Sequence, residues 1–390
     1  MNIETSVLQE PVPKKARAAS FPVRKTASGS SCPSEAPDWL DRGQIPGLDG
    51  LRAIAVIMVM ASHAVQSPGF PEWTWLRNLA HCGRYGVDIF FVISGFLITT
   101  LLAREMERTG HLNLQRFFAR RFLRIIPAYL LLLVVVAGLQ YSGKLQITAR
   151  DWVGALTYTS NFLYHPCWDL GHTWSLAVEE HFYLLWPTVL FVGGILGGWR
   201  MACGCIVGCW AIRCVIAIIL PQFLSHEDAS FYTRMAENWT FTRLDTISMG
   251  CLLALASRSD IWRSRLNKST SRWHLAGYFA LICICVELAR STKFHLCVSY
   301  TVIGFCIAML LWGAIRSEGL CRRVLANPIL TTIGIGSYSI YLWQQIFIHP
   351  HQQGWIHEFP QNAILAFGAA SLSFWLVERP CNQLKNRIAA

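Results

Sequence analysis

Apolar residues are gathered along the chain into ten runs, which are separated by short polar or charged stretches. A helix of about 20 apolar residues crosses the ~30 Å hydrocarbon core of a bilayer, and only helices or closed barrels satisfy their backbone there. The pattern therefore predicts an all-α polytopic membrane protein with about ten transmembrane helices. We place them near 51–66, 86–103, 122–140, 182–199, 201–220, 244–257, 274–290, 297–315, 328–348 and 361–377, of which 244–257 is the shortest.

The distribution of basic residues gives an independent estimate of topology. Loops on the cytoplasmic side of a membrane carry most of the Lys and Arg. With ten spans and a cytoplasmic N-terminus, 24 of the 34 basic residues fall on the cytoplasmic side and 8 on the opposite side. The remaining two, Arg52 and Arg213, lie within predicted spans. This bias predicts that both termini are cytoplasmic.

Composition fits this picture and excludes other classes of protein. The chain has 390 residues, 53% of them hydrophobic and only 15% charged, with a mean hydropathy of +0.36. The net charge of +11 is dispersed over short loops, so we expect no nucleic-acid partner. Residues 1–45 are polar and basic and lack the apolar core of a signal peptide, which predicts a disordered tail. We expect a membrane domain over 46–380 and a cytoplasmic tail over 381–390.

The fourteen cysteines do not form a metal-binding pattern. Most fall in or beside apolar spans, where a thiol acts as a small packing residue. The C-x-C pairs at 203/205 and 283/285 lack a second pair of ligands at metal spacing, so we expect no metal. Cys82 and Cys167 are both assigned to the outer side, where an oxidising compartment would allow a disulfide between them.

Candidate chemistry begins in the first two spans. Arg52 and His63 are eleven residues apart, about three helical turns, so both point to nearly the same face with a rise of roughly 16 Å between them. Ionisable side chains within a span are costly and are usually functional. In the second span, Asp88 either orients His63 or caps the helix, and the small pair Ser94 and Gly95 lets another backbone or a thin ligand approach.

A basic stripe precedes the third span. Arg116, Arg120 and Arg124 are spaced i, i+4, i+8 with Arg121 beside them, so on a helix they share one face. A membrane anchor explains one or two of these arginines. Four at this spacing favour a phosphate-binding site, because guanidinium groups match phosphate oxygens. A donor rich in phosphate, such as coenzyme A, would bind at this cytoplasmic mouth.

Three further blocks carry polar or ionisable groups. Glu179 and Glu180 are adjacent carboxylates at the edge of an apolar helix, which suits acid–base work, while Trp174 and its aromatic neighbours are typical of the membrane interface. We expect Arg243 and Asp245 to form a local ion pair near the outer mouth, with either a structural or a catalytic role. Tyr338 and Tyr341 either line a sugar site or bond across helices.

Taken in order, these blocks resemble the acyltransferase-3 family of integral membrane O-acyltransferases over about 46–380. The blocks are Leu48-Asp49-Gly50-Leu51-Arg52 with His63, the run from Gly86 to Phe96, the arginines that end at Pro127, Trp174-Ser175-Leu176-Ala177-Val178-Glu179-Glu180, Arg243-Leu244-Asp245 and Ser337-Tyr338-Ser339-Ile340-Tyr341. Members of that family acylate hydroxyls on extracytoplasmic glycans or on small molecules. The resemblance implies an enzyme of the cytoplasmic membrane of a bacterium. It also implies acyl-CoA, with acetyl-CoA the simplest form, as co-substrate and no permanently bound cofactor.

The resemblance also implies roles for individual residues. His63 matches the essential histidine and Arg52 its partner, so we expect His63, Arg52, Glu179, Glu180 and Asp88 to be catalytic. We expect the donor to be bound by Arg116, Arg120, Arg121, Arg124 and Ser94, and the acceptor by Trp174, Arg243, Asp245, Tyr338 and Tyr341. One departure is Gln344, where the family commonly has His. Some members carry a soluble esterase-like domain; with ten residues after Pro380, we expect the membrane module alone.

The reaction requires a base at the acceptor hydroxyl and a positioned thioester. His63 serves either as this base or as a nucleophile that forms an acyl-histidine, and the sequence does not separate the two routes. The competing class is a permease or flippase for a polysaccharide or lipid-linked sugar, without transferase activity. The acyl group, the acceptor and the oligomeric state are not encoded in any of these motifs.

Overall fold

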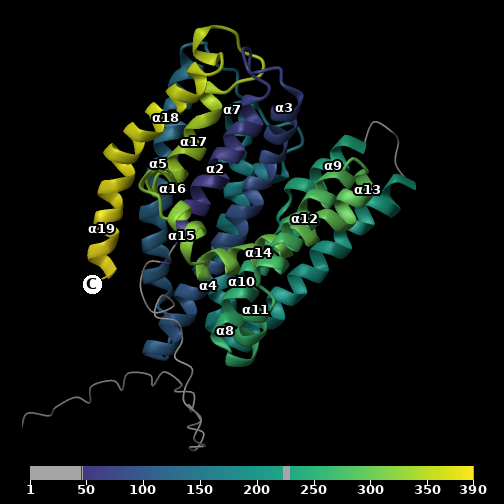
Figure 1. Ribbon diagram of the computed structural model, residues 1–390. Coiled ribbons are helices and arrows are strands. Elements are labelled where there is room, and N and C mark those ends of the chain that lie inside the picture. Colours follow the sequence, from purple (N-terminus) through teal and green to yellow (C-terminus); the bar gives the residue numbers. More distant parts are fainter. Residues whose placement is uncertain (1–44, 46, 223–228, 390) are drawn as a thin grey trace, which may run out of the picture. The chain divides into compact units, whose positions relative to one another are not determined.

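The computed structural model describes residue 45, residues 47–222 and residues 229–389. The predicted disordered tail therefore lies almost wholly outside the described residues. Every regular element in the described ranges is helical, and no strand occurs among them. The prediction of an all-α chain is thus confirmed for these residues (Figure 1).

The helices follow one another with short connections. The α-helices are α2 (Leu48–Ala64), α3 (Thr74–His81), α4 (Gly86–Thr109), α5 (Leu114–Tyr141), α6 (Ala149–Leu156), α7 (Trp168–Gly171), α8 (Thr173–Cys214), α9 (Ala229–Asn238), α10 (Thr240–Arg258), α11 (Asp260–Lys268), α12 (Arg272–Leu288), α13 (Thr292–Phe294), α14 (Tyr300–Arg316), α15 (Gly319–Leu325), α16 (Pro328–Ile335), α17 (Ser337–Phe347), α18 (Gln361–Ser373) and α19 (Arg379–Ala389). Single turns of 3₁₀-helix or π-helix are η1 (Cys82–Tyr85), η2 (Ser160–Phe162), η3 (Val215–Ile219), η4 (Leu220–Gln222), η6 (His295–Ser299), η7 (Trp355–His357) and η8 (Phe374–Glu378).

All ten predicted spans fall on helical segments of the structure. Among the described residues, four helical stretches are both long and apolar enough to cross a membrane: Thr74–Thr109, Leu114–Tyr141, Trp168–Ile219 and Thr292–Arg316. The chain is therefore built as an integral membrane protein would be, and the full count of ten spans stays a prediction.

Helix α8 is a helical hairpin. Gly194 has φ 59° and ψ −161°, a conformation that interrupts the helix and that suits glycine. A Cβ on Gly198 would lie 3.7 Å from the ring of Trp186, although twelve residues of straight helix would separate them by about 18 Å. The chain thus reverses near Gly194, whereas the sequence placed the link between these two spans at Arg200.

The predicted span at 328–348 consists of two short helices. Helix α16 ends at Ile335 and α17 begins at Ser337, with Gly336 between them outside helical geometry. Helix α16 packs against the start of α2, where a Cβ on Gly334 would lie 1.8 Å from the carbonyl oxygen of Asp49. Apolarity alone did not reveal this break, because apolar residues continue on both sides of Gly336.

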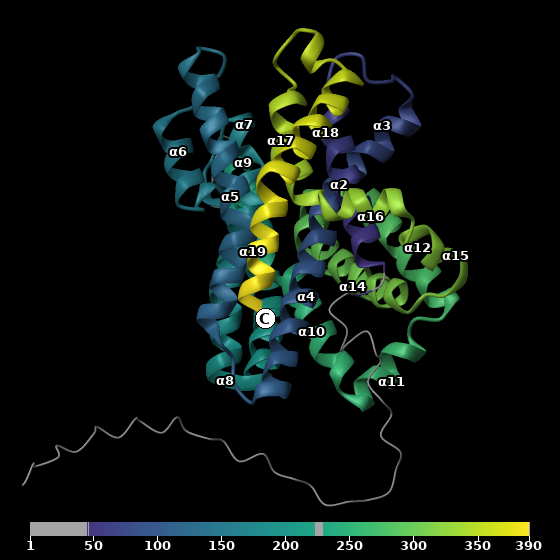
Figure 2. The same cartoon turned by 90° about the vertical axis from the view of Figure 1, so that its left-hand side faces the viewer.

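Helices α4 and α10 pack backbone to backbone. A Cβ on Gly95 would lie 2.0 Å from the carbonyl oxygen of Ile247, and one on Gly250 would lie 2.1 Å from that of Val92. Small residues at such crossings let helices approach closely in membranes. Gly95 therefore admits another backbone, which is one of the two roles predicted for it. Figure 2 shows α4 and α10 side by side.

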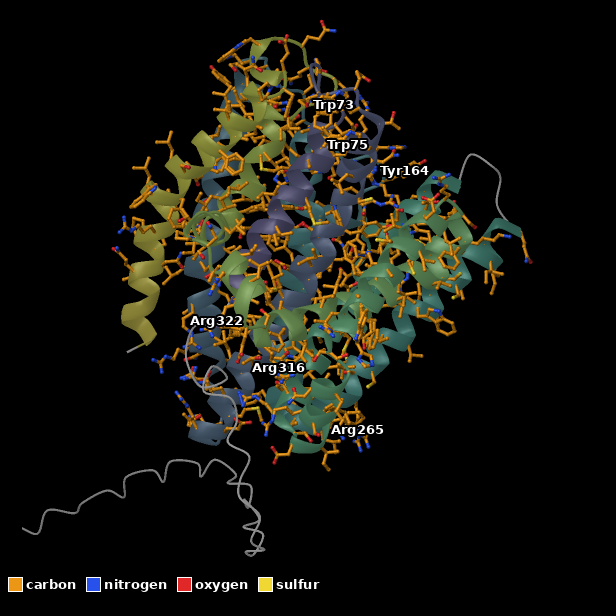
Figure 3. The ribbon with its side chains drawn as sticks, viewed as in Figure 1. Trp73, Trp75, Tyr164, Arg265, Arg316 and Arg322 are labelled. Carbon is orange, nitrogen blue, oxygen red and sulfur yellow. The ribbon has the colours of Figure 1, made fainter. Side chains whose placement is uncertain are left out.

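Three arginines from different parts of the chain lie toward one end of the helices. Figure 3 places Arg265, Arg316 and Arg322 toward one end and Trp73, Trp75 and Tyr164 toward the other. Arginine is typical of the cytoplasmic side, and Trp and Tyr of membrane interfaces. The three arginines lie toward the same end, as expected for loops that share one side of the membrane, and the orientation of the chain stays a prediction.

Candidate active site

The arginine stripe lines a cavity that we call the basic cavity. Asn113 caps α5 by accepting a hydrogen bond from the backbone N–H of Arg116 at 2.9 Å, which fixes the start of the helix. Arg116, Arg120, Arg121 and Arg124 all line the basic cavity, which encloses about 1080 Å³ of empty space. The predicted gathering of these four side chains on one face is confirmed. The guanidinium of Arg120 also lies 3.6 Å from the carboxylate of Glu105.

A second cavity, the middle cavity, lies deeper in the protein. It is lined by Arg52 from α2, Arg121 and Arg124 from α5, and Glu179 and Glu180 from α8, and has about 820 Å³ of empty space that is partly open to solvent. Three cations and two carboxylates therefore meet within one site, although they come from three distant parts of the sequence. The structure brings Arg52 together with the Glu pair, as catalytic groups of one site would be.

Glu179 is held by hydroxyl groups. Ser94 donates a hydrogen bond of 2.6 Å to Glu179 Oε1, and the hydroxyl of Tyr183 lies 3.3 Å from Ser94 Oγ. The guanidinium of Arg121 sits over the ring of Tyr183 at 4.9 Å. Ser94, which we expected near the donor, thus lines the middle cavity and orients a carboxylate.

The two predicted tyrosines also line the middle cavity. Tyr338 donates to the backbone carbonyl of Ile125 at 3.0 Å. The hydroxyl of Tyr341 lies 2.6 Å from Ser175 Oγ and donates to the carbonyl of His172 at 3.0 Å. Both hydroxyls bond across helices, which was one of the two predicted roles. Their rings still face the space in which a substrate would lie.

His63 lines a third cavity, the histidine cavity, of about 1110 Å³. It lies in the last turn of α2, and its Nδ1 is 3.2 Å from Oε1 of Gln344, which is fully buried on α17. The edge of the ring faces Trp168, with 5.4 Å between ring centroids. An amide oxygen accepts only, so Nδ1 carries the proton and Nε2 keeps a free lone pair.

His172 repeats this arrangement beside it. Its Nδ1 lies 2.7 Å from Oε1 of Gln345, the residue that follows Gln344, and its backbone N–H donates to the same oxygen at 3.0 Å. His172 is buried, lines the histidine cavity, and its Nε2 has no hydrogen-bond partner among the described residues. No role was predicted for His172 from the sequence. Its position two residues before Trp174, in the block that also carries Glu179 and Glu180, could have marked it as a candidate site residue.

The loop after α17 carries further histidines, of which His351 reaches this cavity. His351 lines the histidine cavity, and His349 holds the loop by accepting two backbone hydrogen bonds of 3.1 Å at Nδ1, from the N–H groups of residues 351 and 352. Burial, followed by the neighbouring rings of His357 and His351, lowers the pKa of His349 to about 4. His349 is therefore neutral near pH 7 and acts as an acceptor.

Two buried ion pairs replace the local pair expected between Arg243 and Asp245. Arg243 donates to Asp88 at 2.6 Å, and Asp245 pairs with the fully buried Arg213. The local pair was wrong because the two side chains point to different helices, Arg243 to α4 and Asp245 to the second arm of α8. Asp88 therefore does not orient His63. No role was predicted for Arg213. Its place inside an apolar span could have indicated that it needs a buried carboxylate partner.

Arg243 and Trp174 lie beside the histidine cavity. Both line a small adjoining cavity of about 460 Å³, the side cavity, and Trp174 also lines the histidine cavity. The guanidinium of Arg243 lies 5.9 Å from the ring of Trp174. Asp245, the remaining residue predicted to contact the acceptor, is buried in its pair with Arg213.

The three larger cavities share lining residues. Arg121 and Arg124 line both the basic and the middle cavity, and Val87 and Tyr341 line both the middle and the histidine cavity. Three neighbouring cavities therefore lie between the arginine stripe and His63, and each shares wall residues with the next.

Cys82 and Cys167 are both free thiols, so the disulfide considered between them is not formed. Cys82 instead donates a weak hydrogen bond to the carbonyl of Asn78.

Comparison with known proteins supports a family assignment. The family model described as an acyltransferase domain, Acyl_transf_3, matches residues 45–378. O-acetyltransferase OatA of Staphylococcus aureus (strain NCTC 8325 / PS 47) is 31% identical over 363 residues, covering 86% of this chain and 57% of the relative. Putative O-acetyltransferase SACOL0978 of S. aureus (strain COL) is 30% identical over 360 residues, with the same coverage.

No solved structure matches the chain significantly. The chain spans somewhat more than half of the length of the curated relatives it matches. The family model, in contrast, covers most of the chain, including every residue of the three cavities. The chain therefore belongs to the acyltransferase-3 family.

Proposed function

We propose that the chain is an integral membrane O-acyltransferase of a bacterial cytoplasmic membrane. It would transfer an acyl group, most simply acetyl, from cytoplasmic acyl-CoA to a hydroxyl of an extracytoplasmic carbohydrate. The family and the O-acetyltransferase relatives support acyl transfer. Ten spans with both termini cytoplasmic are part of the same proposal, since they put the arginine stripe on the side where acyl-CoA is found.

The observation that carries the proposal is the row of three neighbouring cavities, with shared wall residues, between the arginine stripe and His63. The phosphates of the donor would contact Arg116, Arg120, Arg121 and Arg124, because guanidinium groups bind phosphate oxygens through paired hydrogen bonds. The flexible pantetheine arm of the donor would extend into the middle cavity, past Arg121 and Arg124, which line both the basic and the middle cavity. The thioester would then reach His63, where the acceptor enters from the other side.

The chemistry follows from the tautomer that Gln344 selects. With the proton of His63 held at Nδ1, Nε2 is free to take the proton of the acceptor hydroxyl. The oxygen of this hydroxyl attacks the carbonyl carbon of the thioester at the same time. The C–S bond then breaks and the thiolate of coenzyme A leaves, taking up a proton. A glutamine fulfils this orienting role at the position where the family pattern commonly has histidine.

Labelled acetyl-CoA added to the full-length protein in membranes tests the proposal. We expect label in the glycan fraction, and we expect His63→Ala to lower transfer by about 100-fold or more, the usual contribution of a general base. His274→Ala, at an exposed position on α12, is the matched control and should keep full transfer. Retained transfer in His63→Ala would remove this residue from the mechanism. Glycan export without any transfer of label would favour the permease.

A further inference from the structure

The histidine cavity carries an excess of positive charge that the proposed chemistry does not use. Arg84 from η1 and Arg234 from α9 both line it, and none of the described residues that line it is Asp or Glu. Neither arginine forms an ion pair within the described part of the chain. Arg84 donates to the hydroxyl of Tyr85 at 3.0 Å, and Nε of Arg234 is buried without a partner.

Three carboxylates lie near the histidine cavity, and none of them lines it. Asp88 pairs with Arg243, and Asp169 lies 4.0 Å from His349. Glu237 lines the side cavity and lies 3.6 Å from the ring of His295. Glu237 attracts both guanidinium groups, but it does not line the histidine cavity. The charged side chains that line this cavity are therefore all cationic, and a confined cavity lined by one sign of charge concentrates ligands of the opposite sign.

We infer that the acceptor is an acidic saccharide, whose carboxylate or phosphate oxygens bind Arg84 and Arg234 while a hydroxyl is presented to His63. This inference rests on the proposed function, because it assigns the occupant of the histidine cavity to the acceptor. The same cavity holds His63, so a molecule bound there lies where the acyl group arrives. Trp168 and Trp174 line the same space and offer apolar ring faces to a sugar.

This site is separate from the one that would hold the donor. The donor arginines lie in the basic and middle cavities, and none of them lines the histidine cavity. The protein thus has two clusters of guanidinium groups, one for each substrate. Loss of Arg84 and Arg234 should therefore weaken acceptor binding and leave donor binding unchanged.

A matched pair of probes tests the inference. Tetragalacturonate and its fully methyl-esterified form differ in the charge of the carboxyl groups. Binding of each is measured on the full-length protein in nanodiscs of zwitterionic lipid at low salt. We expect the charged form to bind at least about tenfold more tightly, and added salt to reduce the difference. The double variant Arg84→Gln with Arg234→Gln should abolish the difference in affinity between the two probes.

The controls separate this inference from the proposed function and from lipid binding. Arg150→Gln changes an exposed arginine that lines none of the cavities, and should keep the charge preference. Equal binding of the two probes with intact transfer of labelled acetyl would overturn the acidic acceptor alone. Charge-selective binding without any transfer would overturn only the proposed function. Loss of the preference in nanodiscs that contain phosphatidylglycerol would identify a lipid headgroup as the occupant, and would overturn the saccharide.

Discussion

The contact between His63 and Gln344 is the residue-scale feature with the clearest consequence. Gln344→Leu keeps the approximate volume of the side chain but removes the acceptor that holds the proton at Nδ1. A buried hydrogen bond contributes about 1–3 kcal/mol when its loss leaves one group unsatisfied. We therefore expect acyl transfer to fall by roughly 5- to 100-fold, mainly in kcat, measured with labelled acetyl-CoA at equal protein abundance.

Gln344→His supplies the control for that substitution. Its ring nitrogen can accept the same hydrogen bond, and histidine is the residue expected at this position from the family pattern. This variant should retain more transfer than Gln344→Leu. If both variants were as active as the unchanged protein, Gln344 would have no part in orienting His63.

At single residues, the sequence predicts how side chains are spaced along one helix. It does not predict which neighbouring helix each side chain contacts. Arg116, Arg120 and Arg124 were correctly placed on one face because a single helix fixes their geometry. Arg243 and Asp245 were wrongly paired, since two residues on one helix point to different neighbours and only the packing of α4 and α8 selects the partners. His172 was missed for the same reason, as Gln345 comes from α17, far along the chain.

At the scale of helices, the crossing of α4 and α10 depends on two glycines. Gly95→Ala places a methyl group where the carbonyl oxygen of Ile247 now lies, so the helices must separate. Overpacking of this kind costs about 1–3 kcal/mol. We expect a lower thermal midpoint of unfolding in detergent, and weaker acyl transfer because Ser94 and Arg243 lie on these same helices.

Gly277→Ala on α12 is the matched comparison, because a Cβ there meets no atom within 4 Å. Its thermal midpoint should stay the same or rise, since alanine favours the helix over glycine. Equal midpoints for the two variants would show that α4 and α10 can separate without cost.

Apolar runs in the sequence correctly predicted where the helices lie. They did not predict where a helix is interrupted. All ten apolar runs are helical, because a run of this length has no other way to satisfy its backbone in lipid. The reversal at Gly194 and the interruption at Gly336 lie inside apolar sequence. Glycine at both places permits a break, but many other glycines in the chain lie in unbroken helix, so tertiary packing decides which of them are used.

For the whole molecule, the proposed mechanism depends on the two sides of the membrane. Acyl-CoA must meet the arginine stripe on the cytoplasmic side, and the acceptor must reach His63 from the other. Helices α5 and α6 are joined through an exposed turn at Ser142, and α11 and α12 through a half-exposed turn at Ser269. With ten spans and cytoplasmic termini, the first turn lies outside and the second inside.

Epitope tags inserted after Ser142 and after Ser269, and tags at each terminus, test this arrangement in spheroplasts. We expect antibody to reach the tag at Ser142 in intact spheroplasts, because the turn follows α5 at the end opposite the arginine stripe. The tag at Ser269 and both terminal tags should react only after permeabilisation, as the flanking arginines of α11 and α12 favour the cytoplasmic side. Each insertion is kept only where acyl transfer persists, so that the protein examined is folded. A C-terminal tag that reacts in intact spheroplasts would require an odd number of crossings, and would place the end of α19 on the side opposite to the donor.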